Sequence, residues 1–175
     1  MMKRILFAIM AFCLVNISAM AGLDISVTKG DKKFFKTSEG NAVLEIVWDG
    51  ATYSKSESLS AHFDNFDELK KRAEASFTET FNKKCKKVKI ADKAADTMYK
   101  LTLKVADMDQ YVNVMGFIPG KATKIWGTIT VSNAQTGEEL VVIAVDEVDG
   151  GANPSPDNSF ADCFKELAVQ VCKLK

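Results

Sequence analysis

The chain has 175 residues, of which 47% are hydrophobic and 26% charged, and its 23 basic side chains balance 23 acidic ones. This size and composition suit one folded domain with its own core, and they argue against a disordered or fibrous chain. The balanced charge argues against nucleic acid as a main partner, because nucleic-acid-binding proteins present a strong basic field to the phosphates.

The first 21 residues have the pattern of a secretory signal peptide. The basic start MMKR precedes an unbroken apolar run, residues 5–15, and residues 19–21 read Ala-Met-Ala. These marks are typical of a signal peptide, whereas a membrane-spanning helix needs about 20 apolar residues. Phe12 precedes Cys13 at a position where a lipoprotein signal needs a small residue. We therefore expect cleavage after Ala21, export to the periplasm or the exterior, and no lipid anchor.

The remaining chain is expected to contain one domain. Residues 22–41 are polar and mixed, and we expect a loose leader with room for one short edge strand near residues 25–27. No repeat, linker or low-complexity tract interrupts residues 42–175, which are therefore assigned to a single α/β domain. Its first strand is predicted at residues 42–48, AVLEIVW, where only Glu45 interrupts an apolar run rich in strand-forming residues.

A helix is predicted at residues 65–84. Apolar residues recur there at steps of three and four, which places them on one face of a helix. Asp64 is expected to cap the start, and two lysines at the end suit the negative pole of the helix dipole. The apolar face consists of Phe66, Leu69, Ala73, Phe77 and Phe81.

Three further strands follow the helix. In residues 99–105, YKLTLKV, apolar side chains alternate with Lys and Thr, which predicts a strand with one wet face. Residues 125–131 alternate in the same way, and residues 140–145 are apolar throughout, as in a central strand. Gly137 supplies the positive φ that the turn at residues 133–138 needs.

A second helix is predicted at the end of the chain. It is expected to begin near Ser159, after the breaker-rich segment DGGANPSP, with Asp162 completing a weak capping box. We therefore expect an α/β (α+β) fold: a two-layer sandwich with a mostly antiparallel or mixed sheet of about four to five strands and two helices on one face. The apolar stripe of the second helix consists of Phe160, Cys163, Phe164, Leu167, Val171 and Leu174.

The segments YKLTLKV and WGTITVSNAQTGEELVVIAVDEV, followed by the closing helix, resemble small exported α/β domains of Gram-negative bacteria. That group includes the α/β domains of the Tol-associated periplasmic protein and of curli-secretion-type proteins, in which a D-x-x-T-G-E turn precedes a strand and a carboxy-terminal helix. The turn in this chain spans residues 133–138, with Asn133 in place of the commoner Asp. The resemblance covers about two thirds of the chain after the leader. It implies a role in envelope assembly or interaction and supplies no catalytic residue.

Candidate catalytic residues are few. His62 is the only histidine, so a Ser-His or Cys-His mechanism would have to use it, together with a serine of residues 54–60 in the first case. No G-x-S-x-G elbow surrounds those serines, and a serine-rich loop is usually solvated. We therefore expect no catalytic residue, and a small periplasmic hydrolase is the alternative.

Acidic residues follow two of the predicted strands. A calcium-dependent enzyme that uses these acids is therefore another alternative to a non-enzymatic protein. Oxygen clusters can hold calcium, but the EF-hand spacing is absent, and acids at strand ends more often face water. The cysteines and the single histidine match no zinc signature, and DGGAN alone is no nucleotide-binding motif. We expect no metal and no cofactor; binding of a small apolar ligand between sheet and helices is a third alternative. The strand-end acids are Asp107, Asp109, Asp146, Glu147 and Asp149.

Export would permit a disulfide, although three cysteines after the leader leave at least one thiol free. Cys163 and Cys172 are separated by about 13.5 Å along one predicted helix, beyond the limit of roughly 7 Å between bonded Cα atoms. Cys163 follows the apolar stripe, which indicates a small buried side chain. If the strands alternate in direction, both helices run the same way, and Cys85 and Cys172 share one end of the molecule. A Cys85–Cys172 bond and free thiols both remain open.

Residues 106–122 form a long, unusually apolar connection and are the best functional candidate. Loops beyond about 12–15 residues are often functional, and exposed apolar patches mark contact surfaces. In the alternative, the flanking strands extend and pack on the domain, because Val112 and Val114 alternate with polar residues. The candidate contact residues are Tyr111, Met115, Phe117, Ile118 and Pro119.

These patterns favour a non-enzymatic exported envelope protein that acts as a protein-interaction or assembly module. The expected partner is an unidentified envelope protein or a membrane surface, and we expect no nucleic acid.

Overall fold

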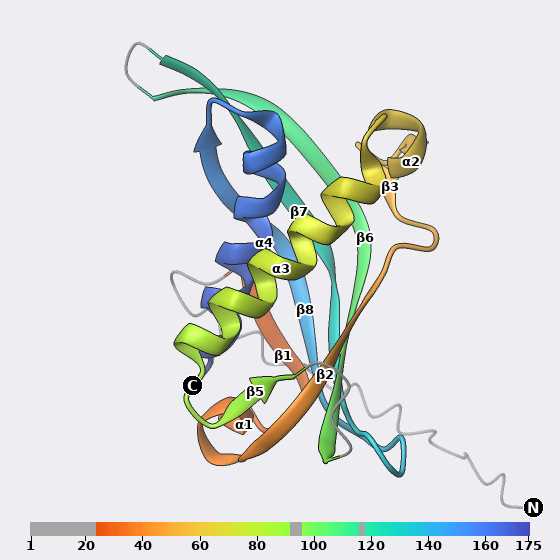
Figure 1. Cartoon of the computed structure of the whole chain (residues 1–175), viewed down its shortest axis with the longest axis vertical. Coiled ribbons are helices and arrows are strands. Elements are labelled where there is room, and N and C mark those ends of the chain that lie inside the picture. The colour runs from red at the N-terminus through yellow and green to blue at the C-terminus, as the bar shows by residue number, and fades with distance from the viewer. Residues whose placement is uncertain (1–23, 92–95, 116–117) are drawn as a thin grey trace, which may run out of the picture.

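A computed structural model of the chain describes residues 24–91, 96–115 and 118–175. These residues form one large mixed sheet with helices packed on one face (Figure 1). None of the described helices is long and apolar enough to cross a membrane. The elements are β1 (Ile25–Gly30), α1 (Phe34–Thr37), β2 (Gly40–Val47), β3 (Thr52–Tyr53), β4 (Glu57–Ser58), α2 (Leu59–His62), α3 (Phe66–Lys84), β5 (Val88–Ile90), β6 (Thr97–Met115), β7 (Ile118–Asn133), β8 (Glu139–Asn153) and α4 (Pro156–Lys173).

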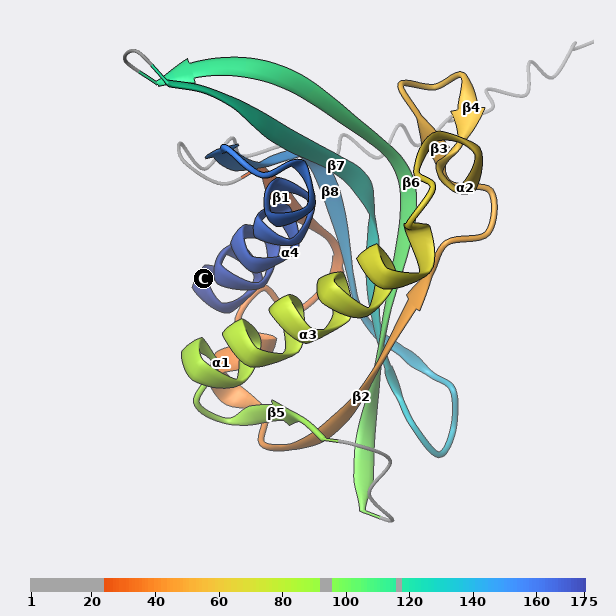
Figure 2. The same ribbon diagram turned by 45° about the horizontal axis from the view of Figure 1, so that its top comes forward.

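The sheet runs in the order β1-β8-β7-β6-β2-β5; β3 pairs with the outer part of β6, and β4 pairs with β3. The pairs from β1 to β6 are antiparallel, whereas β2 is parallel to both β5 and β6. The helices α3 and α4 lie side by side across one face (Figure 2). The parallel β2–β6 pair requires a crossover, which α3 supplies.

The prediction of a two-layer sandwich with four to five strands and two helices is wrong. The described residues form an 8-stranded mixed sheet and four helices. The missed elements are short: β3 and β4 have two residues each, β5 has three, and α1 and α2 have four each. Elements this short show no periodic pattern of apolar residues. They are stabilised by pairing with distant parts of the chain and not by the preferences of their own residues.

Residues 24–41 also add to the sheet. The sequence predicted a loose leader with room for one short edge strand near residues 25–27. That strand is present as β1, which pairs with β8 at the edge of the sheet, whereas α1, whose Phe34 and Phe35 are buried, was not predicted. Phe34 packs edge-on against Tyr99, and Phe35 packs edge-on against Phe81. The aromatic pair therefore anchors this segment under the helices.

The core lies between the sheet and the two long helices. The prediction of a helix at residues 65–84 agrees with α3, and its expected apolar face is buried except for Phe66, which is half-buried. The cap of α3 is Asn65, not Asp64, and its side chain makes no capping hydrogen bond. The largest fully buried side chains include Phe77, Phe81, Phe160, Phe164, Leu101, Leu103, Ile129 and Ile143.

The helix α4 begins earlier than predicted. Ser155 caps it, since its hydroxyl accepts a hydrogen bond from the backbone N–H of Asn158 at 3.4 Å, and Pro156 follows. A proline in the first turn is pre-set for a helix start, so Pro156 was an available signal for this boundary. Ser159, the predicted cap, is instead buried inside the helix and contacts the Thr123 hydroxyl at 2.8 Å.

Three bulges bend the sheet at one level. The register shifts between Val105 and Asp107 on β6. At the same level of the β7–β8 pair it shifts between Ala122 and Lys124 and between Ile125 and Gly127, and a further shift lies between Val131 and Ser132. A bulge adds a residue to one strand, which bends that strand and increases its twist. The outer parts of β6 and β7 therefore curve away from the plane of the inner sheet (Figure 2).

Candidate interaction site

The strands β6 and β7 continue past the rest of the sheet as a two-stranded ribbon. Their pairing runs to Met115 opposite Ile118, whereas the outermost contact of β8 with β7 joins Asn153 to Lys121. We call Val112–Met115 and Ile118–Lys121 the distal arm. In Figures 1 and 2 this ribbon extends beyond α4 and ends far from the body of the sheet.

The predicted contact residues lie on or next to the distal arm. Tyr111 is half-buried at its base, Met115 ends β6, and Ile118 and Pro119 begin β7. Phe117 lies outside the described residues. The segment predicted as a connection is thus extended strand over its described part, as the alternative interpretation expected.

Val112 is the most exposed large apolar side chain in the described chain. Its exposed fraction is 63%, and the other such residue, Met98 at 50%, lies at the opposite end of β6. The alternative interpretation also expected these residues to pack on the domain. Val112 does not pack in this way, because most of its side chain is exposed.

Charged and aromatic side chains brace the base of the distal arm. The Tyr111 hydroxyl donates to Asp149 Oδ2, and Lys124 Nζ donates to Glu147 Oε1. The ammonium of Lys124 also lies 4.8 Å from the centroid of the Tyr111 ring. The hydrogen bond to Glu147 raises the pKa of Lys124. These contacts tie β6, β7 and β8 together where the arm leaves the sheet, so the arm starts from a fixed base.

His62 ends α2 and belongs to a local structural cluster. Its Nδ1 lies 2.8 Å from Glu57 Oε1, and its ring stacks on Tyr53 with the centroids 3.4 Å apart. The Ser58 hydroxyl caps α2 by accepting from the backbone N–H of Ala61 at 3.2 Å. The nearby serine is therefore used in folding the segment, and no contact in the described chain joins it to His62.

The strand-end acids form two separate sets. Asp107 accepts from the Thr52 hydroxyl at 2.5 Å and from the Lys55 backbone N–H at 2.9 Å, and Asp109 accepts from Ser54 at 2.7 Å. This set holds the β3–β4 turn against β6, whereas Asp149 and Glu147 brace the distal arm. Among the residues that the structure describes, no cluster of three or more potential ligands could hold a metal ion.

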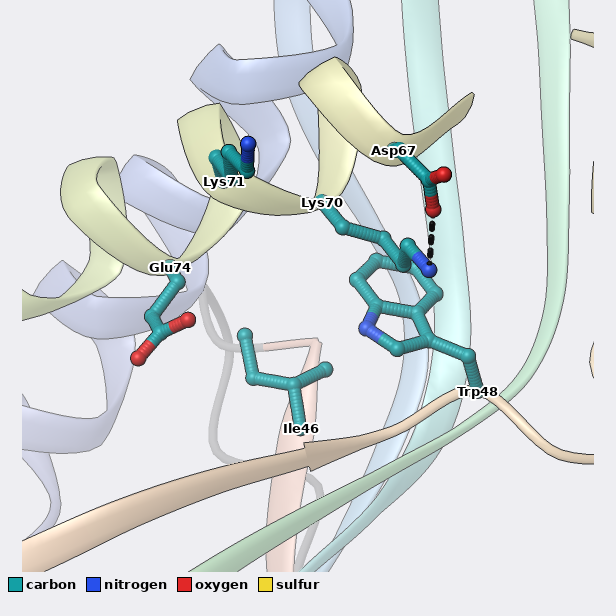
Figure 3. A pocket seen from close by; sticks show the side chains of 6 residues that line it. All are labelled: Ile46, Trp48, Asp67, Lys70, Lys71 and Glu74. Carbon is teal, nitrogen blue, oxygen red and sulfur yellow. Dashed lines mark ion pairs between the residues drawn. The ribbon is translucent and has the colours of Figure 1, made fainter. Parts of the chain in front are cut away.

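A groove separates β2 from α3. It has a volume of about 340 Å³, with Ile46 and Trp48 on its floor (Figure 3). Lys70 and Asp67 form an ion pair of 2.6 Å at its rim, where Glu74 also lies. Four of the six lining residues are charged, so the groove is more polar than most small-ligand sites, and its volume is near the lower end of their range.

The structure places Cys85 and Cys172 close together. Cys85 caps the C-terminus of α3, Cys172 lies in the last turn of α4, and Phe81 O accepts from both the Cys172 thiol and the Cys85 backbone N–H. Cys163 is fully buried among the core side chains, as predicted, and burial raises the pKa of its thiol.

Comparison with known proteins leaves the family of this chain open. No protein-family model and no curated protein matches the sequence. The solved structures that are similar to it at low identity include the following three. A PelC dodecamer from Paraburkholderia phytofirmans has 16% identity and a TM-score of 0.47, covering 86% of this chain and 97% of that one. A second PelC structure, an L103M dodecamer from the same organism, has 13% identity and a TM-score of 0.44, covering 84% and 95%.

The third structure, a putative neuraminyllactose-binding hemagglutinin homolog from Helicobacter pylori, has 10% identity and a TM-score of 0.41, covering 83% of this chain and 87% of that one. Likeness at these scores assigns no function. None of the three is a Tol-associated or curli-secretion protein, so the resemblance noted in the sequence stays a prediction.

Two features of the site were not predicted. The ion pair between Lys124 and Glu147 joins β7 to β8 beside the bulges in that pair. No local sequence pattern indicates where those bulges lie, so the contact could not be predicted. The floor of the groove was also missed, although Trp48, an aromatic residue at the end of a predicted strand, was an available signal.

Proposed function

We propose that the protein is exported to the cell envelope and acts there by binding another protein through the distal arm, without catalysis. The observation that supports this proposal is a braced two-stranded ribbon that leaves the sheet and exposes 63% of Val112. The free backbone edges of such a ribbon can also pair with a strand of the partner.

A protein partner is favoured over a membrane surface by the charges near the arm. Attraction to anionic lipids needs a cluster of unpaired basic side chains. Lys124 is instead neutralised by Glu147, and the acids Asp109 and Asp149 lie at the same level of the sheet. These acids would oppose contact with an anionic bilayer.

Site-specific crosslinking tests the proposal. A photoreactive residue replaces Val112 in one variant and Met98 in a matched control, because both side chains are exposed and both lie on β6. The two positions are up to about 46 Å apart at 3.3 Å per residue. Irradiation of cell-envelope preparations should give a discrete protein adduct from position 112 and none from position 98. Equal adducts from both positions, or adducts with lipid alone, would refute the proposal.

Serine substitutions give a second test on the captured protein once it is purified. Val112→Ser and the double change Phe117→Ser/Ile118→Ser should weaken binding, whereas Met98→Ser should not. Burying the exposed part of a valine contributes roughly 1–2 kcal/mol, which corresponds to about a tenfold change in Kd. Val112→Ser and Met98→Ser should keep the melting temperature of the parent, since substitutions at exposed sites rarely shift stability by more than about 0.5 kcal/mol. A large loss of stability with binding retained would indicate that the arm packs on the domain.

A second candidate function, binding of a small apolar ligand, is supported by the groove over Trp48. Titration with small aromatic and aliphatic ligands should then change the fluorescence of Trp48, and Trp48→Phe should abolish the change while Trp126→Phe should not. Equal responses in both variants would exclude the groove as the binding site.

A further inference from the structure

The helices α3 and α4 run parallel and are joined at both ends. At their N-termini, the side-chain amide of Asn65 donates to Asp157 Oδ2 at 3.0 Å. At their C-termini, one carbonyl connects the two cysteines: Phe81 O accepts from the backbone N–H of Cys85 at 2.7 Å and from the Cys172 thiol at 3.9 Å. Figure 2 shows these C-terminal ends on the same side of the molecule.

We propose that Cys85 and Cys172 form a disulfide bond that locks the C-terminal ends of α3 and α4 together. Phe81 O accepts from both residues, so the Cys172 thiol already lies beside the Cys85 backbone and little movement is needed to join the two sulfurs. Cys163 cannot pair with Cys172, because the two are nine residues apart on α4, about 13.5 Å at 1.5 Å per residue, and the Cys163 thiol donates to Phe160 O at 3.0 Å inside the core. The pairing does not depend on the function of the distal arm.

The surroundings of Cys85 favour its thiolate, which is the reactive form. The hydrogen bond from Cys172 lowers the pKa of Cys85 to about 6, and the backbone N–H groups of Val88 and Lys87 contribute in the same direction. Lys89 adds positive charge: its ammonium donates to Asn82 O and to Cys85 O, both at 2.6 Å. Cys172 is half-buried and is the more exposed partner of the pair.

The bond forms by exchange with a disulfide-bearing oxidant, R–S–S–R, of the kind present in oxidising compartments. One thiolate of the pair attacks the oxidant, its S–S bond breaks, and R–S⁻ leaves. The second thiol gives up its proton and displaces the other R–S⁻ from the mixed disulfide. The pair loses two protons and two electrons, and the oxidant is reduced to two R–S–H.

The bond closes a long segment of the chain. It joins the end of α3 to the end of α4 and so encloses β5, β6, β7, β8 and most of α4. Closing a long loop restricts the unfolded chain strongly, and for a protein of this size it raises the melting temperature by about 10 °C.

The test compares the reduced and oxidised forms of the full-length wild-type protein, so it does not depend on the folding of a variant. The reduced protein is incubated with oxidised glutathione, alkylated after unfolding, digested and mapped, with each cysteine followed separately, Cys13 included. We expect a peptide that joins Cys85 to Cys172, an alkylated Cys163, and a melting temperature about 10 °C above that of the reduced form.

Two variants provide the matched controls. Cys163→Ala should keep the joined peptide and the rise in melting temperature on oxidation, whereas Cys172→Ser should lose both. Alkylation of Cys85 and Cys172 after oxidation, a bond to Cys163, or bonds between chains only would each overturn the proposal.

Discussion

Replacing Gly150 with alanine should separate α4 from the sheet. A Cβ at this position would lie 2.3 Å from the backbone N of Cys163 and 2.7 Å from its Cα. Both are main-chain atoms, which cannot move aside as a flexible side chain can. Either α4 or β8 must therefore shift, and the fully buried Phe160, Phe164 and Leu167 would lose part of their packing.

The expected cost is roughly 2–4 kcal/mol, since added volume in a packed core costs about 1–3 kcal/mol and a rigid backbone neighbour places the site at the upper end. At about 2–4 °C per kcal/mol for a chain of this size, the melting temperature should fall by about 10 °C. Thermal unfolding followed by circular dichroism measures the change.

Gly137→Ala is the matched control. Gly137 has a φ of 74°, and a Cβ added there would meet nothing within 4 Å, so alanine costs only the left-handed backbone, about 1 kcal/mol. Gly150→Ala should therefore destabilise clearly more than Gly137→Ala. Equal effects, or a milder effect at Gly150, would refute the close approach of α4 to β8.

Two more predictions concern the base of the distal arm. Tyr111→Phe removes the donor to Asp149 and should lower the free energy of unfolding by about 1–2 kcal/mol in denaturant titration, because the acceptor is a carboxylate. Tyr99→Phe, which removes a longer bond of 3.4 Å to Glu39 O, should cost less, and equal losses would contradict the brace. The contact with Glu147 raises the pKa of Lys124 in the folded protein. The ion pair therefore stabilises the fold fully below the pKa of Lys124 in the unfolded chain, about 10.4, and this stabilisation is lost as the pH rises through the folded-state pKa. The stability advantage of wild type over Glu147→Gln, below about 1 kcal/mol for so exposed a pair, should therefore disappear in alkaline solution, and a constant difference between about pH 8 and 12 would contradict the pairing.

The sequence predicts those parts of the fold that repeat a period over several turns or residues. The face of α3 that carries Leu69, Ala73, Phe77 and Phe81 is buried as its spacing indicates. Gly137 has a φ of 74° in the turn between β7 and β8, as predicted for that turn. In both cases the local sequence pattern alone is enough to identify the residue's place in the fold.

The short elements could not be predicted in the same way. Each of β3, β4 and β5 depends on a partner elsewhere in the chain, as when Thr52 pairs with Asp107 and Gly40 with Val88. Two or three residues give no period, so the strand forms only because its partner is already in place. The burial of Phe34 and Phe35 was missed for a related reason. Lysines flank them in the sequence, which suggests an exposed segment, and they are buried only because Tyr99 and Phe81 pack against them.

The distal arm shows where local pattern and tertiary structure diverge. The alternation of Val112 and Val114 indicates a strand, but an alternating pattern does not say whether neighbouring strands continue beside it. The bulges on β6 and β8 decide this, because they bend β6 and β7 out of the sheet while β8 ends at Asn153. A bulge follows from a one-residue mismatch between two strands, which neither strand reveals alone.

The two proposals concern opposite ends of α4 and can fail separately. The N-terminal end of α4 lies near the base of the arm, where the Gln110 side chain donates to Pro156 O at 3.4 Å and Asn153 donates to Asp162 at 2.9 Å. Cys172 lies in the last turn at the other end, about 24 Å away at 1.5 Å per residue. The contacts at the N-terminal end of α4 involve neither cysteine, so reduction of the disulfide should lower the melting temperature and leave crosslinking from position 112 unchanged. Loss of crosslinking on reduction would instead indicate that the packing of α4 controls the arm.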